Sequence, residues 1–209
     1  MSIEKVNELV VKGKAKLIAA AVQESLDEGC APSDLLNAMI SAMDVVGENF
    51  KNGVIFGPEM LIAAKAMKKG VEVLKPHLAS GEAGALGKVI IGTVAGDLHD
   101  IGKNLVAMMI ESAGFEVIDL GVDVPAEKFV EAYEANPDTK VMALSALLTT
   151  TMPSLQACVE AINKSSWRGN VKVMVGGAPI TQEFADSIGA DAYTPDAASA
   201  AKKAKELVA

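Results

Sequence analysis

The 209-residue chain is poor in cysteine, histidine and aromatic residues, and each scarcity excludes a class of structure or function. Its two cysteines, Cys30 and Cys158, are far apart and lack metal-ligand spacing, so we expect reduced, buried thiols of a cytoplasmic protein. Histidine occurs only at positions 77 and 99. A metal centre built from several histidines is therefore hard to assemble.

Basic clusters and long apolar runs are also missing. The net charge is −8 and the sequence has no Lys/Arg cluster, which argues against a nucleic acid or an anionic membrane as partner. No apolar run is long enough for a membrane span, and the N-terminus has no signal-type apolar core. Neither a Gly-x-Gly-x-x-Gly nor a Walker sequence occurs, so the commoner nucleotide sites are excluded.

The first 84 residues carry helical signals only. Apolar residues recur at helical spacing over 3–11 and 17–26, from Pro32 to just before Gly53, and from Gly57 toward Pro76. This pattern predicts a four-helix bundle as a first domain, residues 1–84. A stretch rich in small residues, 79–87, predicts a linker to a second domain, residues 85–209.

From Lys88 onward, strand-like and helix-like segments alternate. This alternation predicts an α/β domain with a doubly wound, flavodoxin-like, five-stranded parallel sheet of order 2-1-3-4-5. The carboxyl ends of strands one, three and four then meet at the switch point, where ligands bind. The expected strands are 89–94, 115–120, 141–145, 171–175 and 191–193, and the expected helices are 104–113, 125–135, 153–164, 181–188 and 197–208.

The segment Gly96–Asn104 follows the first expected strand and contains His99. An imidazole on such a loop ligates a metal well when its other nitrogen is held by a hydrogen bond, and Asp97 is placed to accept one. Other interpretations stay open on these residues alone. His99 is a structural loop histidine, or it shares Zn²⁺ or Mn²⁺ with Asp97, or His99-Asp100 belongs to a metal phosphohydrolase.

Three separated motifs, Asp97-x-His99-x-x-Gly102, Ser145-Ala146-Leu147 and Gly176-Gly177, together show a resemblance. The chain resembles the cobalamin-binding domain of cobalamin-dependent methionine synthase over nearly its whole length. It is most similar to the small corrinoid carrier proteins of methanogen and acetogen methyltransferase systems. The resemblance implies that His99 is the lower axial ligand of a cobalamin cobalt and that Asp97 accepts a hydrogen bond from it. Thr151 then completes the relay, where methionine synthase has serine.

The resemblance also implies a wider set of cofactor contacts. Ser145 and Thr149 would give hydroxyls to the nucleotide tail, Leu147 would wall its base, and the glycines would leave room for the ligand. The segments 46–50 and 56–60 resemble the family's cap, with Phe56 and Met60 as possible corrin contacts, although methionines 39, 43, 60 and 67 are expected in the core. The expected contacts are Gly96, Leu98, Asp100, Ile101, Gly102, Leu105, Gly121, Ser145, Leu147, Thr149, Gly176, Gly177 and Tyr193.

The implied function is that of a non-catalytic methyl carrier. A substrate-specific methyltransferase, of the methylated-amine or betaine type, would place a methyl group on cobalt(I). A second methyltransferase would move it to coenzyme M or tetrahydrofolate, and a reductive activase would be a further partner. The alternatives are a cobalamin-dependent sensor and the cobalamin subunit of a mutase. A sensor of this kind carries a tryptophan in its helical bundle, whereas the single tryptophan here, Trp167, lies outside the expected bundle. The sequence does not identify the methyl donor.

Overall fold

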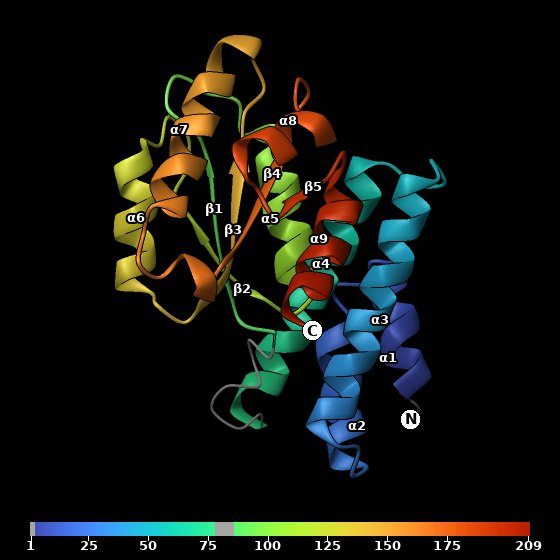
Figure 1. Cartoon of the computed structure of the whole chain (residues 1–209). Helices are drawn as coiled ribbons and strands as arrows, with labels where there is room; N and C mark the ends of the chain where they lie inside the picture. The colour runs from blue at the N-terminus through green and yellow to red at the C-terminus, as the bar shows by residue number, and fades with distance from the viewer. Residues whose placement is uncertain (1–2, 78–85) are drawn as a thin grey trace. The chain divides into compact units, whose positions relative to one another are not determined.

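The computed structural model describes residues 3–77 and 86–209 and divides into two compact units (Figure 1). One comprises Met1–Ala85 with Ser112–Gly114, and the other comprises Leu86–Glu111 with Phe115–Ala209. Most of the predicted linker, 79–87, lies outside the described residues. No helix in the described ranges is long and apolar enough to cross a membrane.

The helical unit is built on an apolar core that runs through all four of its long helices. Its third helix begins at Pro32, which has no N–H to lose in the first turn, and the glycine after its end, Gly53, has a positive φ of 70°. The four methionines expected in the core are all buried, with at most 2% of their surface exposed. The elements are α1 (Ile3–Val11), α2 (Ile18–Asp27), α3 (Pro32–Lys51), α4 (Gly57–Leu74) and the short η1 (Lys75–His77).

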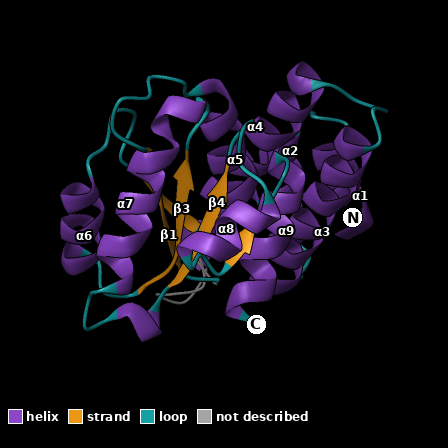
Figure 2. Cartoon of the chain, turned by 45° about the horizontal axis from the view of Figure 1, so that its top comes forward, coloured by secondary structure: helices purple, strands orange, loops and turns teal. Residues whose placement is uncertain are grey.

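The second unit is a five-stranded sheet in the order β2-β1-β3-β4-β5, with all pairs parallel. This order confirms the predicted doubly wound topology. Helices α6 and α7 cover one face of the sheet, and α5 and α9 cover the other (Figure 2). The elements are β1 (Lys88–Thr93), α5 (Ile101–Ser112), β2 (Glu116–Asp119), α6 (Ala126–Ala135), β3 (Thr139–Ser145), η3 (Thr149–Thr151), α7 (Met152–Asn163), η4 (Arg168–Asn170), β4 (Lys172–Gly176), α8 (Gln182–Ile188), β5 (Ala192–Tyr193) and α9 (Ala197–Val208).

One helix begins earlier than its sequence pattern predicts. Helix α5 starts at Ile101 instead of 104, because the Asn104 amide donates to the Asp100 carbonyl at 2.7 Å and the Asn104 side chain bonds the Asp100 carboxylate at 3.1 Å. Gly102 therefore lies in the first helical turn and not in a loop. The loop that carries His99 is correspondingly short.

The core of the sheet unit lies between the strands and helices α6, α7 and α8. Cys158 is buried in it, and this burial raises the pKa of its thiol to about 12, with a further contribution from the charge of Glu127. Cys30 is only half-buried, so the expectation of two buried cysteines holds for Cys158 alone. At the edge of this core the rings of Tyr133 and Trp167 stack, with centroids 3.9 Å apart.

Candidate functional site

The site begins with a tight turn at the carboxyl end of β1. The Asp97 amide donates to the Val94 carbonyl at 3.2 Å, and Gly96 has a φ of +83°. A positive φ at this position of a four-residue turn favours glycine, because a side chain would be strained there. The turn aims the Asp97 side chain inward, where it is fully buried.

The Asp97 carboxylate accepts four hydrogen bonds. Oδ1 accepts from the backbone amide of His99 at 3.1 Å and from its Nδ1 at 2.7 Å. Oδ2 accepts from the Leu147 amide at 2.7 Å and from the Thr151 hydroxyl at 2.8 Å. An ionised carboxylate has about four lone-pair positions, so all of its acceptor capacity is used. Asp97 is therefore in direct contact with His99 and with Thr151, the other two residues predicted to form the relay.

These contacts decide the charge of Asp97. Burial alone would raise the pKa of the carboxyl, because it disfavours the ionised form. The hydrogen bonds from the backbone amides of Leu147 and His99, and from the side chains of His99 and Thr151, outweigh burial and hold that pKa well below its usual range. Asp97 is consequently ionised at neutral pH.

The orientation of His99 follows from that charge. Because Nδ1 faces an ionised carboxylate, it carries the proton, and a neutral imidazole then has its lone pair on Nε2. The side chain is half exposed, at 50% of its surface. The geometry thus presents one ligating nitrogen at the edge of the sheet, with its tautomer fixed by a buried anion.

Three further residues make contacts in this loop or in the helix that directly follows it, and they were not predicted as site residues. The buried hydroxyl of Thr93 donates to the carbonyl of His99 at 2.9 Å. Asp123, at a φ of 54°, accepts from the Gly96 amide at 2.7 Å, and its own amide donates to the Asp97 carbonyl at 3.0 Å. Lys103 pairs with the Asp119 carboxylate at 2.5 Å, with only 2% of its side chain exposed.

The sequence carries a signal for only one of these three residues. Thr93 is a hydroxyl residue inside an otherwise apolar strand. A hydroxyl buried in such a strand needs a hydrogen-bond partner. The role of Asp123 depends on the path of the chain after β2. That path brings residues 27 positions apart together, and no local pattern predicts it.

Four exposed side chains form an apolar rim: Leu98 on the loop after β1, Ile101 at the start of α5, and Leu147 and Leu148 on the loop after β3. Leu98 and Ile101 are 73% and 85% exposed, and Leu147 and Leu148 are 37% and 40% exposed. Large apolar side chains gathered on one edge mark a surface that a bulky ligand or partner covers. Three of the four were predicted contacts, and Leu148 is an addition.

The glycines of the site fall into two classes. A Cβ added at Gly102 or Gly121 would meet nothing within 4 Å, so both leave open space. A Cβ at Gly177 would lie 1.8 Å from the Ala146 carbonyl oxygen, and one at Gly176 would lie 3.1 Å from the Thr194 carbonyl oxygen. Gly176 and Gly177 were expected to leave room for the ligand. This expectation is corrected, because neighbouring backbone fills the room that these two glycines leave.

The remaining predicted contacts differ in accessibility. Asp100 and Thr149 are exposed, and Leu105, Ser145 and Tyr193 are half-buried. In the helical unit, Phe56 is 66% exposed, whereas Met60 is fully buried in the bundle core. Phe56 is thus available for a contact and Met60 is a core side chain. The contacts of these residues with a cofactor stay predictions.

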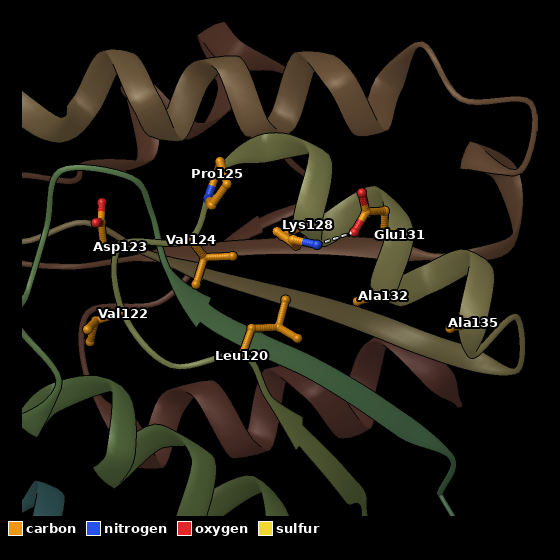
Figure 3. A pocket seen from close by; sticks show the side chains of 9 residues that line it. All are labelled: Leu120, Val122, Asp123, Val124, Pro125, Lys128, Glu131, Ala132 and Ala135. Carbon is orange, nitrogen blue, oxygen red and sulfur yellow. Dashed lines mark hydrogen bonds and ion pairs between the residues drawn. The ribbon is translucent and has the colours of Figure 1, made fainter.

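A separate cavity of about 450 Å³ lies along α6 and the loop before it (Figure 3). Its rim carries the ion pair of Lys128 and Glu131, and its floor is apolar. None of the predicted cofactor contacts lines it. The lining residues are Leu120, Val122, Asp123, Val124, Pro125, Lys128, Glu131, Ala132 and Ala135.

The donor set at the edge of the sheet fits a metal group that brings most of its own ligands. Within residues 3–77 and 86–209, no three His, Cys, Asp or Glu side chains are grouped so as to hold a metal ion. A corrin ring brings four nitrogen ligands of its own, so one imidazole is enough to complete the lower side of its cobalt. The exposed His99, the apolar rim and the open space at Gly102 and Gly121 fit such a ring.

Comparisons with known proteins agree with this fit. A model of the B12 binding domain matches residues 87–202, and a second B12 binding domain model matches residues 2–75. The chain is 46% identical to dimethylamine corrinoid protein 1 of Methanosarcina acetivorans over 96% of its length and 94% of that protein. It is 43% identical to trimethylamine corrinoid protein 2 of the same organism, over 99% and 96% of the two chains.

Two solved structures resemble the whole chain. A cobalamin-binding protein from Desulfitobacterium hafniense aligns with a TM-score of 0.84 and 30% identity, covering 100% of this chain and 99% of that one. A chain of the methanol:cobalamin methyltransferase complex MtaBC from Methanosarcina barkeri aligns with a TM-score of 0.83 and 29% identity, covering 99% and 79%.

Proposed function

Because the chain belongs to the family of cobalamin-binding corrinoid proteins, we propose that it carries methyl groups on a cobalamin whose lower ligand is His99. The observation that carries the proposal is the buried Asp97 carboxylate, which fixes the proton on Nδ1 of an exposed imidazole. The cofactor supplies the cobalt that holds the methyl group. The apolar rim of Leu98, Ile101, Leu147 and Leu148 would contact the ring of the bound cofactor and exclude water from it.

Asp97 and Thr151 adjust the ligand. An ionised carboxylate at Nδ1 makes Nε2 a stronger ligand than a neutral partner would. The Thr151 hydroxyl lies 2.8 Å from Asp97 Oδ2 and 2.9 Å from the Leu148 carbonyl, and it has one hydrogen for two acceptors. When that hydrogen turns to Leu148, Asp97 holds the Nδ1 proton more strongly. The strength of the His99 ligand can therefore vary without movement of the main chain.

For the partners we propose a methylamine-specific methyltransferase as donor. Support comes from the relatives, which are dimethylamine and trimethylamine corrinoid proteins. A second methyltransferase, acting on coenzyme M or tetrahydrofolate, would receive the methyl group, and a reductive activase would restore the reduced cofactor. A cobalamin sensor or mutase subunit would carry an adenosyl cofactor instead. The absorption spectrum of the native protein distinguishes the methyl form from the adenosyl form of the cofactor.

The ligand assignment is tested by electron paramagnetic resonance. Protein labelled with ¹⁵N-histidine is reconstituted with hydroxocobalamin and reduced to the cobalt(II) state. Ligation by His99 gives a ¹⁵N doublet on the cobalt signal, and His99→Ala abolishes it. The matched control is His77→Ala, which removes the other histidine and leaves the doublet. A ¹⁴N triplet from the cofactor's own base in the unmutated protein would refute the assignment.

A further inference from the structure

The buried Thr93 hydroxyl holds the His99 loop from below. Thr93 is the last residue of β1, and none of its surface is exposed. Its Oγ1 donates to the His99 carbonyl oxygen at 2.9 Å. A hydroxyl in a buried strand is costly unless it is hydrogen-bonded, so this contact satisfies Thr93 as well as the loop.

Thr93 is itself fixed by the sheet on both sides. Its amide donates to the Gly121 carbonyl at 2.9 Å, and its carbonyl accepts from the Val124 amide at 2.9 Å. On the other side it is in register with Ser145 of β3. The backbone of Thr93 is therefore held rigidly, and the position of β1 sets the direction of the hydrogen bond from the Thr93 hydroxyl to His99.

His99 is consequently held at three atoms. Its amide and its Nδ1 both bond Oδ1 of Asp97, and its carbonyl bonds Thr93. The two bonds to Asp97 meet at one oxygen, so by themselves they restrain rotation of the residue about that oxygen only weakly. The bond to Thr93, from a different element, restrains this rotation.

We propose that Thr93 is a positioning residue which fixes the direction of His99 Nε2 and thereby the strength of its bond to cobalt. Only the second part of this inference, the strength of the bond to cobalt, rests on the proposed function. The first part, the direction of Nε2, concerns the protein without cofactor. Thr93 bonds the backbone carbonyl of His99, so it acts on the imidazole through the backbone.

The variants separate the hydroxyl from the shape of the side chain. Thr93→Val keeps the branched shape and removes the donor, and Thr93→Ser keeps the donor and removes the methyl group. Thr93→Ala is a second variant without the hydroxyl, in case the valine variant does not fold. Far-UV circular dichroism and thermal melting identify the folded variants.

The first measurement uses the full chain without cofactor and follows the ¹⁵N resonances of the imidazoles. With two histidines in the chain, a His77→Gln variant assigns the signals. The unmutated protein and Thr93→Ser should show His99 as one Nδ1–H tautomer. In Thr93→Val or Thr93→Ala, His99 can turn away from Asp97, which weakens the Nδ1–Asp97 hydrogen bond that holds the Nδ1–H tautomer, so the Nδ1 and Nε2 resonances should shift toward each other. Unchanged resonances in the hydroxyl-free variants would overturn the proposal.

The second measurement uses the same proteins with cobalt(II) cobalamin. Loss of an outer partner of a ligating histidine typically weakens the metal bond about 10–100-fold. We expect a loss near the lower end, about 10-fold, in the ratio of imidazole-ligated to unligated cobalt(II), and recovery in Thr93→Ser. A Thr93→Ser protein that behaves as Thr93→Val does would show that the hydroxyl is not the cause.

The two measurements distinguish failure of this inference from failure of the ligand assignment. If the unmutated protein gives no ¹⁵N doublet, His99 is not the ligand and the cobalt half of the inference falls with it. The tautomer measurement still decides whether Thr93 positions the imidazole. If the doublet is present and all Thr93 variants retain it at full strength, the ligand assignment stands and the positioning role is wrong.

Discussion

At the scale of single residues, the site depends on one buried carboxylate whose acceptor positions are all filled. The spacing of Asp97 and His99 predicted their contact, because two residues of a short loop can close such a ring. Thr151 was placed by resemblance, and its hydroxyl does reach Asp97. Thr93 and Asp123 were not placed, since their contacts depend on how neighbouring strands end, which the residues themselves do not encode.

The ionisation of Asp97 predicts a pH-dependent stability for the protein without cofactor. Because folding lowers the pKa of this carboxyl, its contribution is complete above the pKa of the unfolded chain, about 4, and declines as the pH falls below it. Asp97→Asn places an amide among four donors and should lower the free energy of unfolding at pH 7 by about 1–3 kcal/mol. Urea unfolding at neutral pH and near pH 3 should show this difference shrinking with acid. A constant difference would contradict the prediction.

Thr151 should contribute less to the stability of the protein than Asp97 does. Thr151→Val removes one of four hydrogen bonds to the carboxylate and keeps the shape of the buried side chain. The free energy of unfolding should fall by about 1–2 kcal/mol, because one hydrogen bond to a charged group is lost. Thr151→Ser should restore most of it. The comparison is made by urea unfolding, and equal losses in the two variants would contradict the assignment of the effect to the hydroxyl.

At the scale of elements, the sequence predicted the sheet well and the ends of the elements less well. Alternation of apolar strands and helical segments predicted the order that the structure confirms, since right-handed crossovers leave few alternatives. The start of α5 was missed by three residues, because Ile101, Gly102 and Lys103 carry no strong helix signal and the turn is closed by Asp100 and Asn104. The backbone approaches at Gly176 and Gly177 depend on the register of β3, β4 and β5.

The ion pair of Lys103 and Asp119 joins α5 to the end of β2. Lys103 is buried and Asp119 is 38% exposed, so Lys103→Met leaves a carboxylate that water can still solvate. We expect a loss of about 1–2 kcal/mol in the free energy of unfolding, below the cost of stranding a fully buried charge. The matched control is Lys128→Met, which breaks the solvent-exposed pair with Glu131 and should lower the free energy of unfolding less than Lys103→Met does. Equal losses in urea unfolding would contradict the assignment.

At the scale of the whole molecule, the sheet unit contains the Asp97–His99 site and a core of its own. We expect a fragment of residues 86–209 to fold alone and to bind cobalamin with a stoichiometry near one, measured by absorbance after gel filtration. In this fragment, oxidation of bound cobalt(I) should be faster than in the full chain, if the helical unit shields the cofactor. Equal oxidation rates would refute the shielding role, and a fragment that folds without binding cobalamin would place essential contacts in the helical unit.

The stacked pair of Tyr133 and Trp167 has a consequence for following the molecule in solution. Trp167 is the single tryptophan, and the two tyrosines, Tyr133 and Tyr193, also belong to the sheet unit. The near-ultraviolet absorption and the fluorescence of these residues therefore come from the sheet unit alone, and the helical unit contributes no tyrosine or tryptophan signal. Far-ultraviolet circular dichroism records the helices of both units. When fluorescence and dichroism are followed in one melting experiment, coincident curves mean that the two units unfold together, and separated curves mean that each unfolds by itself.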